Sequence, residues 1–388
     1  MSDLFATSVV GSWPRPRWLL DALKRRNKGE LSIDDFNKIA DEAVLLAIKY
    51  QEDAGIDVIT DGEQRRDNFY SFVVDKLNGV KLMSAAELLD YVENKEMFEN
   101  VLRAQDVPST SIRNPVAVDK VSLKRPLVSD EALFLKEHTR SRIKVTIPGP
   151  YLLTRSMWVK ALSGGVYPTR YDLAKDITKI LREEIIRLRD LGVDFIQLDE
   201  PTLMEVLYGK YGVGSTFMCA VLAARMDPTE ELEFAVNLIN ETIKGIDGVR
   251  LGIHVCRGNW TKNEKALLSG DYRPLLPYLM ETKVKQLVLE FSTPRAGDVD
   301  VLRDYANEKE IGLGVVNPRS DVVESEDFVI ERVKRVIKFQ DAGKVWLNPD
   351  CGFGTFAEVP LVNSEIAYRK LRIMVNAAKK LRQEFTGK

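Results

Sequence analysis

Residues Asp172–Glu200 read DLAKDITKILREEIIRLRDLGVDFIQLDE, and this stretch contains the unit from which the fold is predicted. Asp172–Leu191 has apolar residues at helical spacing and stops at Gly192, which predicts an amphipathic helix. The run Asp194–Leu198 is short and rich in apolar residues, as expected of a buried strand. A helix followed directly by a buried strand is the repeating unit of a parallel α/β fold.

The same alternation continues on both sides of this unit. Ile33–Ala54, Pro228–Ile246 and Glu326–Ala342 have helical periodicity, and the first of them starts after the possible N-cap Ser32 and ends at Gly55. Strands and helices joined by right-handed crossovers build a parallel sheet. Eight strand candidates favour a closed (β/α)8 TIM barrel over the alternative, a doubly wound open sheet. The candidates are Thr7–Val10, Asp57–Thr60, Ile143–Ile147, Asp194–Leu198, Val249–Val255, Gln286–Phe291, Ile311–Val316 and Val345–Leu347.

The extra length of the chain lies mainly between the second and third strand candidates, in Val80–Arg140. This stretch combines helix-like pieces with a polar segment that contains three prolines. We therefore expect residues 1–388 to form a single catalytic barrel domain, with residues 80–140 as an insertion between strands 2 and 3 over the barrel mouth.

Composition excludes several classes of protein. The net charge is −2 and no basic block alternates with aromatic residues, so nucleic acid is not an expected partner. The N-terminus lacks the pattern of a secretion signal, and no apolar run is long enough for a membrane span, so we expect a cytoplasmic protein without membrane contact. The three cysteines are far apart and odd in number, which argues against a disulfide framework. Cys219 lies in an apolar stretch and is expected to be a buried packing residue.

Chemically capable residues gather at the ends of the strand candidates. In a (β/α)8 barrel the active site is built at the carboxyl ends of the strands, so these residues are expected to meet there. In chain order they are Gly11 and Ser12, Asp61 and Glu63, Asp199 and Glu200, His254 and Cys256, Glu290, and Asp350 with Cys351.

His254, Cys256, Glu290 and Cys351 form the sharpest pattern among them. Alternation along a strand puts positions i and i+2 on one face, so His254 and Cys256 can point at one ion. Glu290 lies in an apolar run, where an unpaired carboxylate would be costly to bury. Two thiolates, an imidazole and a carboxylate suit Zn²⁺ better than magnesium or calcium. The simpler interpretation is that the cysteines pack in the core and His254 is a satisfied core histidine.

Several motifs, taken together, resemble the C-terminal catalytic domain of the cobalamin-independent methionine synthase family over nearly the whole chain. They are VVGSWPRP, TDGEQRRD, IPGPYLL, IQLDEPTLME, IHVCRGN, LVLEFST and LNPDCGFGT, in the family's order. The resemblance implies a (β/α)8 barrel with a catalytic zinc, held by His254, Cys256, Glu290 and Cys351. The substrate it implies is homocysteine, whose thiol would be deprotonated by zinc and would then attack a methyl group.

The same resemblance implies roles for further residues. Val10, Gly11 and Ser12 match the turn that binds the carboxylate of homocysteine. Glu63 and Asp199 match the acids that hold its amino group, and two carboxylates are a sensible device for one ammonium. Glu205, after the DEP motif, matches another active-site acid, so Glu205 and Asp199 are the expected catalytic residues.

Departures from the family's pattern concern the methyl donor. The turn after the seventh strand usually carries an Asp and a His for proton transfer to the folate, whereas Asn317 and Arg319 stand near those places here. The aromatic residue that would stack on the pterin has no clear equivalent, since Ser156 is close to that position and Trp158 is two residues on. The length of the chain also leads us to expect no counterpart of the family's N-terminal half that helps to bind folate. These departures favour a methylcorrinoid donor, presented by a partner protein, over methyl-folate.

Two other functions remain open. Short relatives include enzymes that use coenzyme M as the thiol, and Arg65 and Arg66 could face its sulfonate, although Glu63 and Asp199 would then be badly placed. The other possibility is a non-enzymatic protein that stores zinc or docks a corrinoid. This hypothesis predicts that four protein ligands fill the coordination shell of the metal and that added thiols do not change it.

Overall fold

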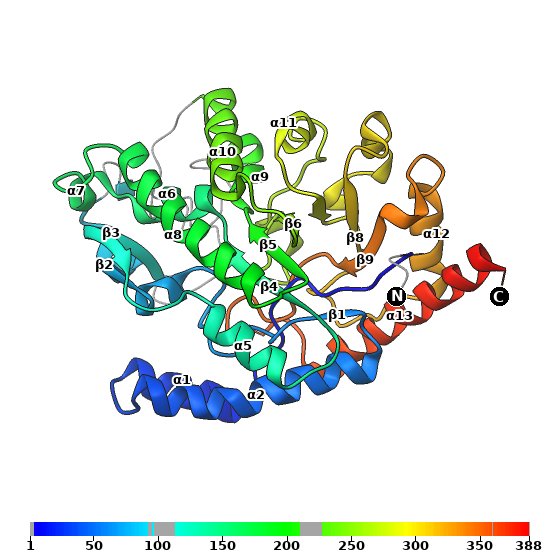
Figure 1. Ribbon diagram of the computed structural model, residues 1–388, viewed down its shortest axis with the longest axis horizontal. Coiled ribbons are helices and arrows are strands. Elements are labelled where there is room, and N and C mark those ends of the chain that lie inside the picture. The colour runs from blue at the N-terminus through cyan, green and yellow to red at the C-terminus, as the bar shows by residue number, and fades with distance from the viewer. Residues whose placement is uncertain (1–3, 92–94, 97–112, 210–226, 359, 388) are drawn as a thin grey trace.

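The fold is built around a seven-stranded parallel sheet with the strand order β1-β4-β5-β6-β7-β8-β9 (Figure 1). The computed structural model describes residues 4–91, 95–96, 113–209, 227–358 and 360–387. Its parallel strands are β1 Val58–Ile59, β4 Arg142–Pro148, β5 Phe195–Asp199, β6 Arg250–Val255, β7 Gln286–Leu289, β8 Glu310–Val316 and β9 Val345–Pro349. The α/β class with a parallel sheet, predicted from the alternation of helices and strands, is confirmed.

The sheet is strongly curled. The rings of Phe195 in β5 and Trp346 in β9 are 6.1 Å apart, although four strand spacings in a flat sheet would separate them by roughly 19 Å. The expected first strand, Thr7–Val10, is reduced to isolated parallel bridges. Thr7 pairs with Leu347 in β9 and Ser8 with Val58 in β1, so this segment lies between the two edge strands.

Local capping explains why the longest helices begin and end where they do. Helix α2, Ile33–Ala54, has the predicted bounds because Ser32 accepts the backbone N–H of Asp35 and Gly55 adopts φ 86°. Helix α8, Arg170–Asp190, begins with a capping box between Thr169 and Asp172. The other α-helices are α1 Arg17–Asn27, α3 Ala85–Leu88, α5 Ser129–Glu137, α6 Pro150–Met157, α7 Lys160–Ser163, α9 Thr202–Tyr208, α10 Pro228–Ile243, α11 Leu276–Glu281, α12 Glu326–Val336 and α13 Ser364–Thr386. The 3-10 turns are η1 Ser71–Asp75, η3 Glu264–Ala266, η4 Pro294–Ala296, η5 Val299–Tyr305 and η6 Ala342–Lys344.

The segment between β1 and β4 contains an antiparallel hairpin that the sequence did not predict. Strands β2, Leu77–Ser84, and β3, Arg113–Leu123, pair with each other and not with the parallel sheet. Residues 92–94 and 97–112 of the expected insertion lie outside the described residues, as does Cys219. An insertion over the barrel mouth therefore stays a prediction.

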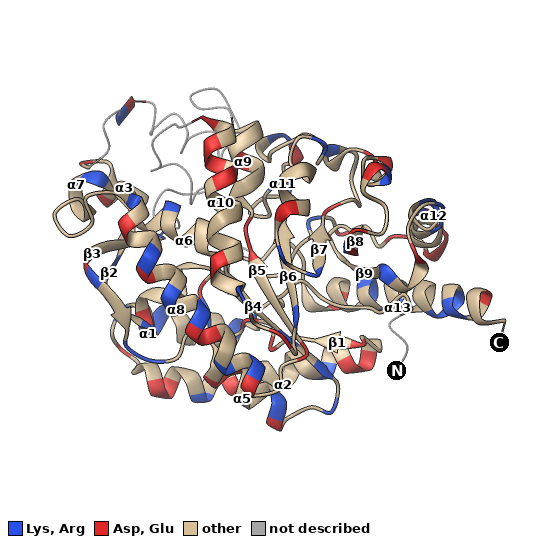
Figure 2. Cartoon of the chain, turned by 45° about the horizontal axis from the view of Figure 1, so that its top comes forward, with Lys and Arg blue, Asp and Glu red and all other residues tan. Residues whose placement is uncertain are grey.

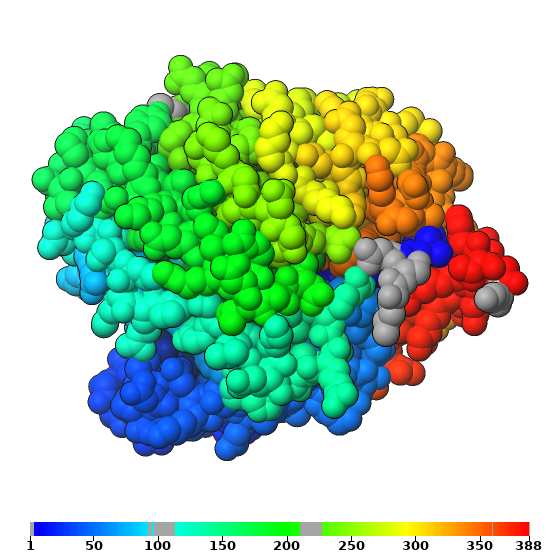
Figure 3. Space-filling view, viewed as in Figure 1, coloured from blue at the N-terminus to red at the C-terminus, as the bar shows by residue number. Residues whose placement is uncertain are grey.

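The two ends of the chain lie together, with the N-terminal residues against α13 (Figure 3). Arg382 of α13 donates to the carbonyl oxygens of Leu4 at 2.9 Å and Phe5 at 2.8 Å. Acidic and basic residues are interspersed along the helices (Figure 2). Within the described part of the chain, no helix is both long and apolar enough to cross a membrane.

Candidate active site and metal centre

His254, Cys256 and Cys351 meet at the carboxyl ends of β6 and β9. Their ligand atoms all lie within 4.8 Å of one another, and His254 Nε2 is 3.6 Å from Cys351 Sγ. His254 Nδ1 lies 3.1 Å from the carbonyl oxygen of Val288 in β7. A proton on Nδ1 makes this hydrogen bond and leaves the Nε2 lone pair facing the thiols, which is the usual arrangement of a metal-binding histidine.

The chemistry of this group fits a soft divalent metal. All three side chains are buried. The hydrogen bond from the Cys351 thiol lowers the pKa of the Cys256 thiol well below its usual range, and His254 acts in the same direction. A thiolate, a second thiol and an imidazole nitrogen in one buried place can hold a zinc ion.

Glu290, the fourth predicted ligand, is not a member of this group. Its carboxylate accepts hydrogen bonds from Arg319 at 2.8 Å, from Arg295, and from the backbone N–H of Arg257 at 2.9 Å. Burial alone would raise the pKa of Glu290, but the three arginines lower it to about 2. Arginines therefore neutralise this buried carboxylate in the structure, and its role as a metal ligand stays a prediction.

Glu63 and Asp199, the predicted acids, both line the same cavity as the metal-binding group. The register of the sheet pairs Asp199 in β5 with His254 in β6. Burial raises the pKa of Asp199 to about 7, and Gln197 donates to its carboxylate at 2.7 Å. Glu63 Oε1 accepts from Thr146 Oγ1 at 2.7 Å, whereas the buried Oε2 has no hydrogen-bond partner among the described residues. These two carboxylates can receive a cationic group.

The backbone around Glu63 is shaped to bring its carboxylate into the cavity. Glu63 has φ 54°, a left-handed conformation that is uncommon for residues other than glycine and is concentrated at functional sites. A Cβ at Gly11 would lie 2.2 Å from Glu63 Oε1, so the absence of a side chain at Gly11 permits this approach. Val10 and Ser12 flank Gly11 on the predicted turn and line the cavity.

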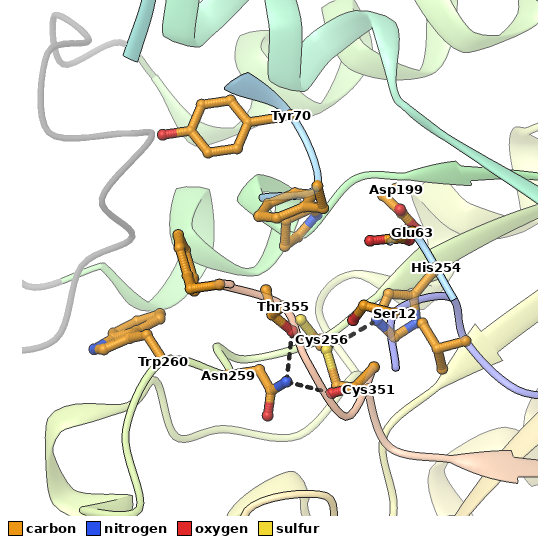
Figure 4. Close-up of a pocket in the computed structure, with 15 residues that line it drawn as sticks. Ser12, Glu63, Tyr70, Asp199, His254, Cys256, Asn259, Trp260, Cys351 and Thr355 are labelled. Carbon is orange, nitrogen blue, oxygen red and sulfur yellow. Dashed lines mark hydrogen bonds between the residues drawn. The ribbon is translucent and has the colours of Figure 1, made fainter. Parts of the chain in front are cut away.

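The cavity has two unlike ends. Figure 4 shows Glu63 and Asp199 beside His254, with Tyr70 and Trp260 further away. Phe69 and Phe356 also line it, with ring centroids 6.4 Å apart in an edge-to-face arrangement. These four aromatic residues, Phe69, Tyr70, Trp260 and Phe356, form an aromatic wall that the sequence analysis did not predict. Trp260 follows Cys256 by four residues, which was the available signal for it.

Asn259 is a further site residue that the sequence analysis missed. Its side-chain amide donates to Gly352 O at 2.7 Å and to Thr355 Oγ1 at 2.6 Å (Figure 4). It therefore ties the loop after Cys256 to the loop after Cys351, and it stands in the quoted IHVCRGN motif.

The other two acids near β5 have structural partners. Glu200 accepts the backbone N–H groups of Tyr151 and Leu152, both at 2.8 Å, at the N-terminus of α6. Glu205, a predicted catalytic residue, forms a buried ion pair with Arg155 at 2.7 Å and is not among the residues that line the cavity. Its predicted catalytic role therefore has no geometric support from the cavity.

Four residues entered the sequence argument about the methyl donor, namely Ser156, Trp158, Asn317 and Arg319. None of them is among the residues that line the cavity. Ser156 is buried in α6, and Trp158 donates to Tyr167 O at 3.0 Å. The backbone N–H of Asn317 donates to Glu324 at 2.8 Å, and Arg319 contacts Glu290.

Fold and site define an α/β protein with a candidate metal centre and two buried acids at the carboxyl ends of its parallel strands. The model of the family described as "Cobalamin-independent synthase, Catalytic domain" matches residues 5–380. The chain belongs to this cobalamin-independent methionine synthase family of methyltransferases that form methionine. The resemblance noted from the motifs is confirmed.

Relatives match over nearly their whole length. The chain is 31% identical to the methionine synthase of Pyrococcus furiosus over 382 residues, which cover 98% of this chain and 94% of that protein. It is 28% identical to the methionine synthase of Saccharolobus solfataricus, covering 99% of this chain and 97% of that protein. Among solved structures, a B12-independent methionine synthase from Shewanella sp. W3-18-1 in complex with selenomethionine superimposes with a TM-score of 0.74. That match covers 99% of this chain and 100% of the other, at 22% identity, and shows the shared fold.

Proposed function

We propose that this protein is a zinc-dependent methyltransferase that methylates the thiol of homocysteine. The observation that carries the proposal is the position of His254, Cys256 and Cys351 in the same cavity as the carboxylates of Glu63 and Asp199. A metal-binding group would receive the sulfur of an amino thiol, and the acids would receive its ammonium.

Different residues of the site would bind different groups of the substrate. Glu63 offers a buried carboxylate oxygen without a partner among the described residues, and Asp199 offers a second acid next to His254. The backbone of Val10, Gly11 and Ser12 would bind the substrate's carboxylate. His254, Cys256 and Cys351 would hold zinc, and a zinc ion there would lower the pKa of the substrate's thiol toward neutrality. The catalytic role of Glu205 stays a prediction.

For the donor we propose methyl-folate and not the methylcorrinoid that the sequence departures favoured. Membership of a cobalamin-independent family supports this choice. The aromatic residues Phe69, Tyr70, Trp260 and Phe356 support it as well, because aromatic side chains stack on flat heteroaromatic rings. Transfer would form the bond from sulfur to the methyl carbon and break the bond from that carbon to the donor's nitrogen. The thiol would lose its proton and the nitrogen of the leaving folate would take one up, so the step balances.

Coenzyme M as the acceptor has less support. Arg65 donates to Asp41 at 3.1 Å, and Arg66 donates to Glu131 at 3.0 Å. Neither arginine is among the residues that line the cavity, whereas the acids that would repel a sulfonate are.

We also propose that residues 1–388 act as one catalytic barrel domain, with residues 80–140 as an insertion over its mouth.

The proposal is tested by methionine formation with the zinc-loaded protein and homocysteine, using methyltetrahydrofolate and methylcobalamin in separate reactions. Turnover with the folate alone is expected. Turnover with methylcobalamin alone would restore the corrinoid donor and keep the thiol chemistry. Failure with both donors, together with turnover on coenzyme M, would refute homocysteine as the acceptor.

A further inference from the structure

The backbone of residues 9–12, which includes the predicted carboxylate-binding turn, is fixed by hydrogen bonds to four successive carbonyl oxygens. The donors come from other strands and loops of the curled sheet. In the order of the carbonyls along the chain, they are Lys144 Nζ at 2.7 Å, Gln197 Nε2 at 3.2 Å, Thr60 Oγ1 at 2.7 Å and the backbone N–H of Phe353 at 2.9 Å. Each carbonyl oxygen of this segment therefore already has a donor within the protein.

The N–H groups of the same turn are not used in this way. Among the residues that the structure describes, none accepts a hydrogen bond from the backbone N–H of Val10, Gly11 or Ser12. All three residues are buried, and Val10 and Ser12 line the cavity. Buried backbone N–H groups are nearly always paired, and successive unpaired ones form a concavity that binds anions. The turn is therefore arranged to receive an anion.

Lys144 is the member of the donor set whose burial is most costly. It lies in β4 with 1% of its side chain exposed, and its ammonium is 4.7 Å from the centroid of the Phe195 ring. Among the described residues, Nζ makes its only hydrogen bond to Val9 O and has no ion-pair partner. Burial lowers the pKa of Lys144 to about 7, although the charges of Glu63 and Asp199 act in the opposite direction. The contact that fixes this side chain is thus the carbonyl at the start of the turn.

We propose that Lys144 is a positioning residue for the carboxylate of the substrate. Its hydrogen bond fixes Val9, so that the N–H groups of residues 10–12 can face a carboxylate in the cavity. Lys144 is not itself among the residues that line the cavity, so it acts through the turn and through its charge. That charge lies near Glu63 and Asp199 and offsets the repulsion between these acids and the substrate's carboxylate. The inference rests on the proposed homocysteine substrate.

Binding of two thiols to the zinc-loaded protein, measured by calorimetry without a methyl donor, tests this role. The second thiol, 3-aminopropane-1-thiol, is homocysteine without its carboxylate. Lys144→Met should raise the dissociation constant of homocysteine about 10- to 100-fold, as expected when a buried charge several ångströms from an anion is lost. The change for 3-aminopropane-1-thiol should be much smaller. An equal loss for both thiols would overturn the inference, because Lys144 would then only support the fold.

Lys370→Met is the matched control, because it removes another buried ammonium, which lies in α13 at 2.9 Å from a carboxylate oxygen of Glu324. The control should bind both thiols as the wild type does. Lys144→Gln, which removes the charge and keeps a polar end, takes the place of Lys144→Met if circular dichroism shows that the methionine variant does not fold, and the same difference between thiols is expected.

The wild type separates failure of the inference from failure of the proposed function. If the wild type binds both thiols equally, the proposed carboxylate site fails and the role of Lys144 fails with it. If the wild type prefers homocysteine and a folded Lys144 variant keeps that preference, the proposed function stands and the role of Lys144 is refuted.

Discussion

Replacement of Gly11 by alanine is expected to weaken binding of the substrate's ammonium group without removing the metal. The new Cβ would lie 2.2 Å from Glu63 Oε1 and 3.1 Å from the methyl group of Thr146, whereas Cβ contacts under 3.0 Å essentially never occur. The carboxylate must move, and Thr146 Oγ1, which donates to it at 2.7 Å, cannot keep its hydrogen bond. Glu63 would then no longer present its oxygen to the cavity.

The magnitude follows from the bond that is lost. A hydrogen bond to a charged group contributes about 1.5–3 kcal/mol. Loss of one such bond to the ammonium corresponds to a rise of about 10- to 150-fold in the homocysteine KM. A thiol without the amino group, 4-sulfanylbutanoate, should show a smaller rise in KM than homocysteine, because it does not use Glu63 but still contacts the turn at Gly11. The assay is KM for both thiols together with zinc content, and Gly165→Ala is the control because its Cβ would meet nothing within 4 Å. An unchanged homocysteine KM in Gly11→Ala would refute the assignment of Glu63.

Three further outcomes are expected. Asp199→Asn should raise the homocysteine KM and leave the zinc content unchanged. Because burial raises the pKa of Asp199 to about 7, kcat/KM of the wild type should fall as the pH drops below that value. Asp199→Asn should not show this fall. If it has the same pH profile as the wild type, the assignment of Asp199 to the substrate's ammonium is contradicted. Cys351→Ser should lose most bound zinc and turnover while circular dichroism stays native, so retained zinc would count against the site. Burial lowers the pKa of Lys144 from 10.5 to about 7. Between pH 7 and pH 10.5 the unfolded chain therefore binds more protons than the folded protein, and the free energy of unfolding should rise with pH in this window. Urea unfolding should show a gain of about 3 kcal/mol over two pH units in the wild type and none in Lys144→Met.

Local sequence signals placed α2 at its observed bounds, whereas the helix predicted over Asp172–Leu191 is observed as α8, Arg170–Asp190. The bounds of α2 and the start of α8 follow from capping residues within three positions of the first turn, so a short window of sequence contains the cause. The hairpin of β2 and β3 could not be predicted in this way. Its pairing joins Leu77 to Leu123, which are far apart in the sequence, and the helix-like pattern of the residues between them was the stronger local signal.

The candidate metal centre was predictable because parallel topology converts positions in sequence into positions in space. His254, Cys256 and Cys351 each stand at the carboxyl end of a strand, and these ends lie at one edge of the curled sheet. The aromatic wall was not predictable, because Phe69 and Phe356 have the same appearance in the sequence as core residues. Only the folded loops, joined by the bridge between Asn68 and Phe356, distinguish them.

Glu290 illustrates the remaining limit, since an acid at a strand end can be a metal ligand or the counter-ion of an arginine. The sequence gives the position of the acid but not its partner, and Arg319 reaches it from 29 residues further along the chain. Arg319 stands near the place where the family's turn usually carries the proton-transferring histidine. An arginine there brings a permanent positive charge into a buried site, which requires an anion, and Glu290 is the carboxylate that it bonds. The arginine in the loop after β8 and the acid after β7 must therefore be interpreted as a pair.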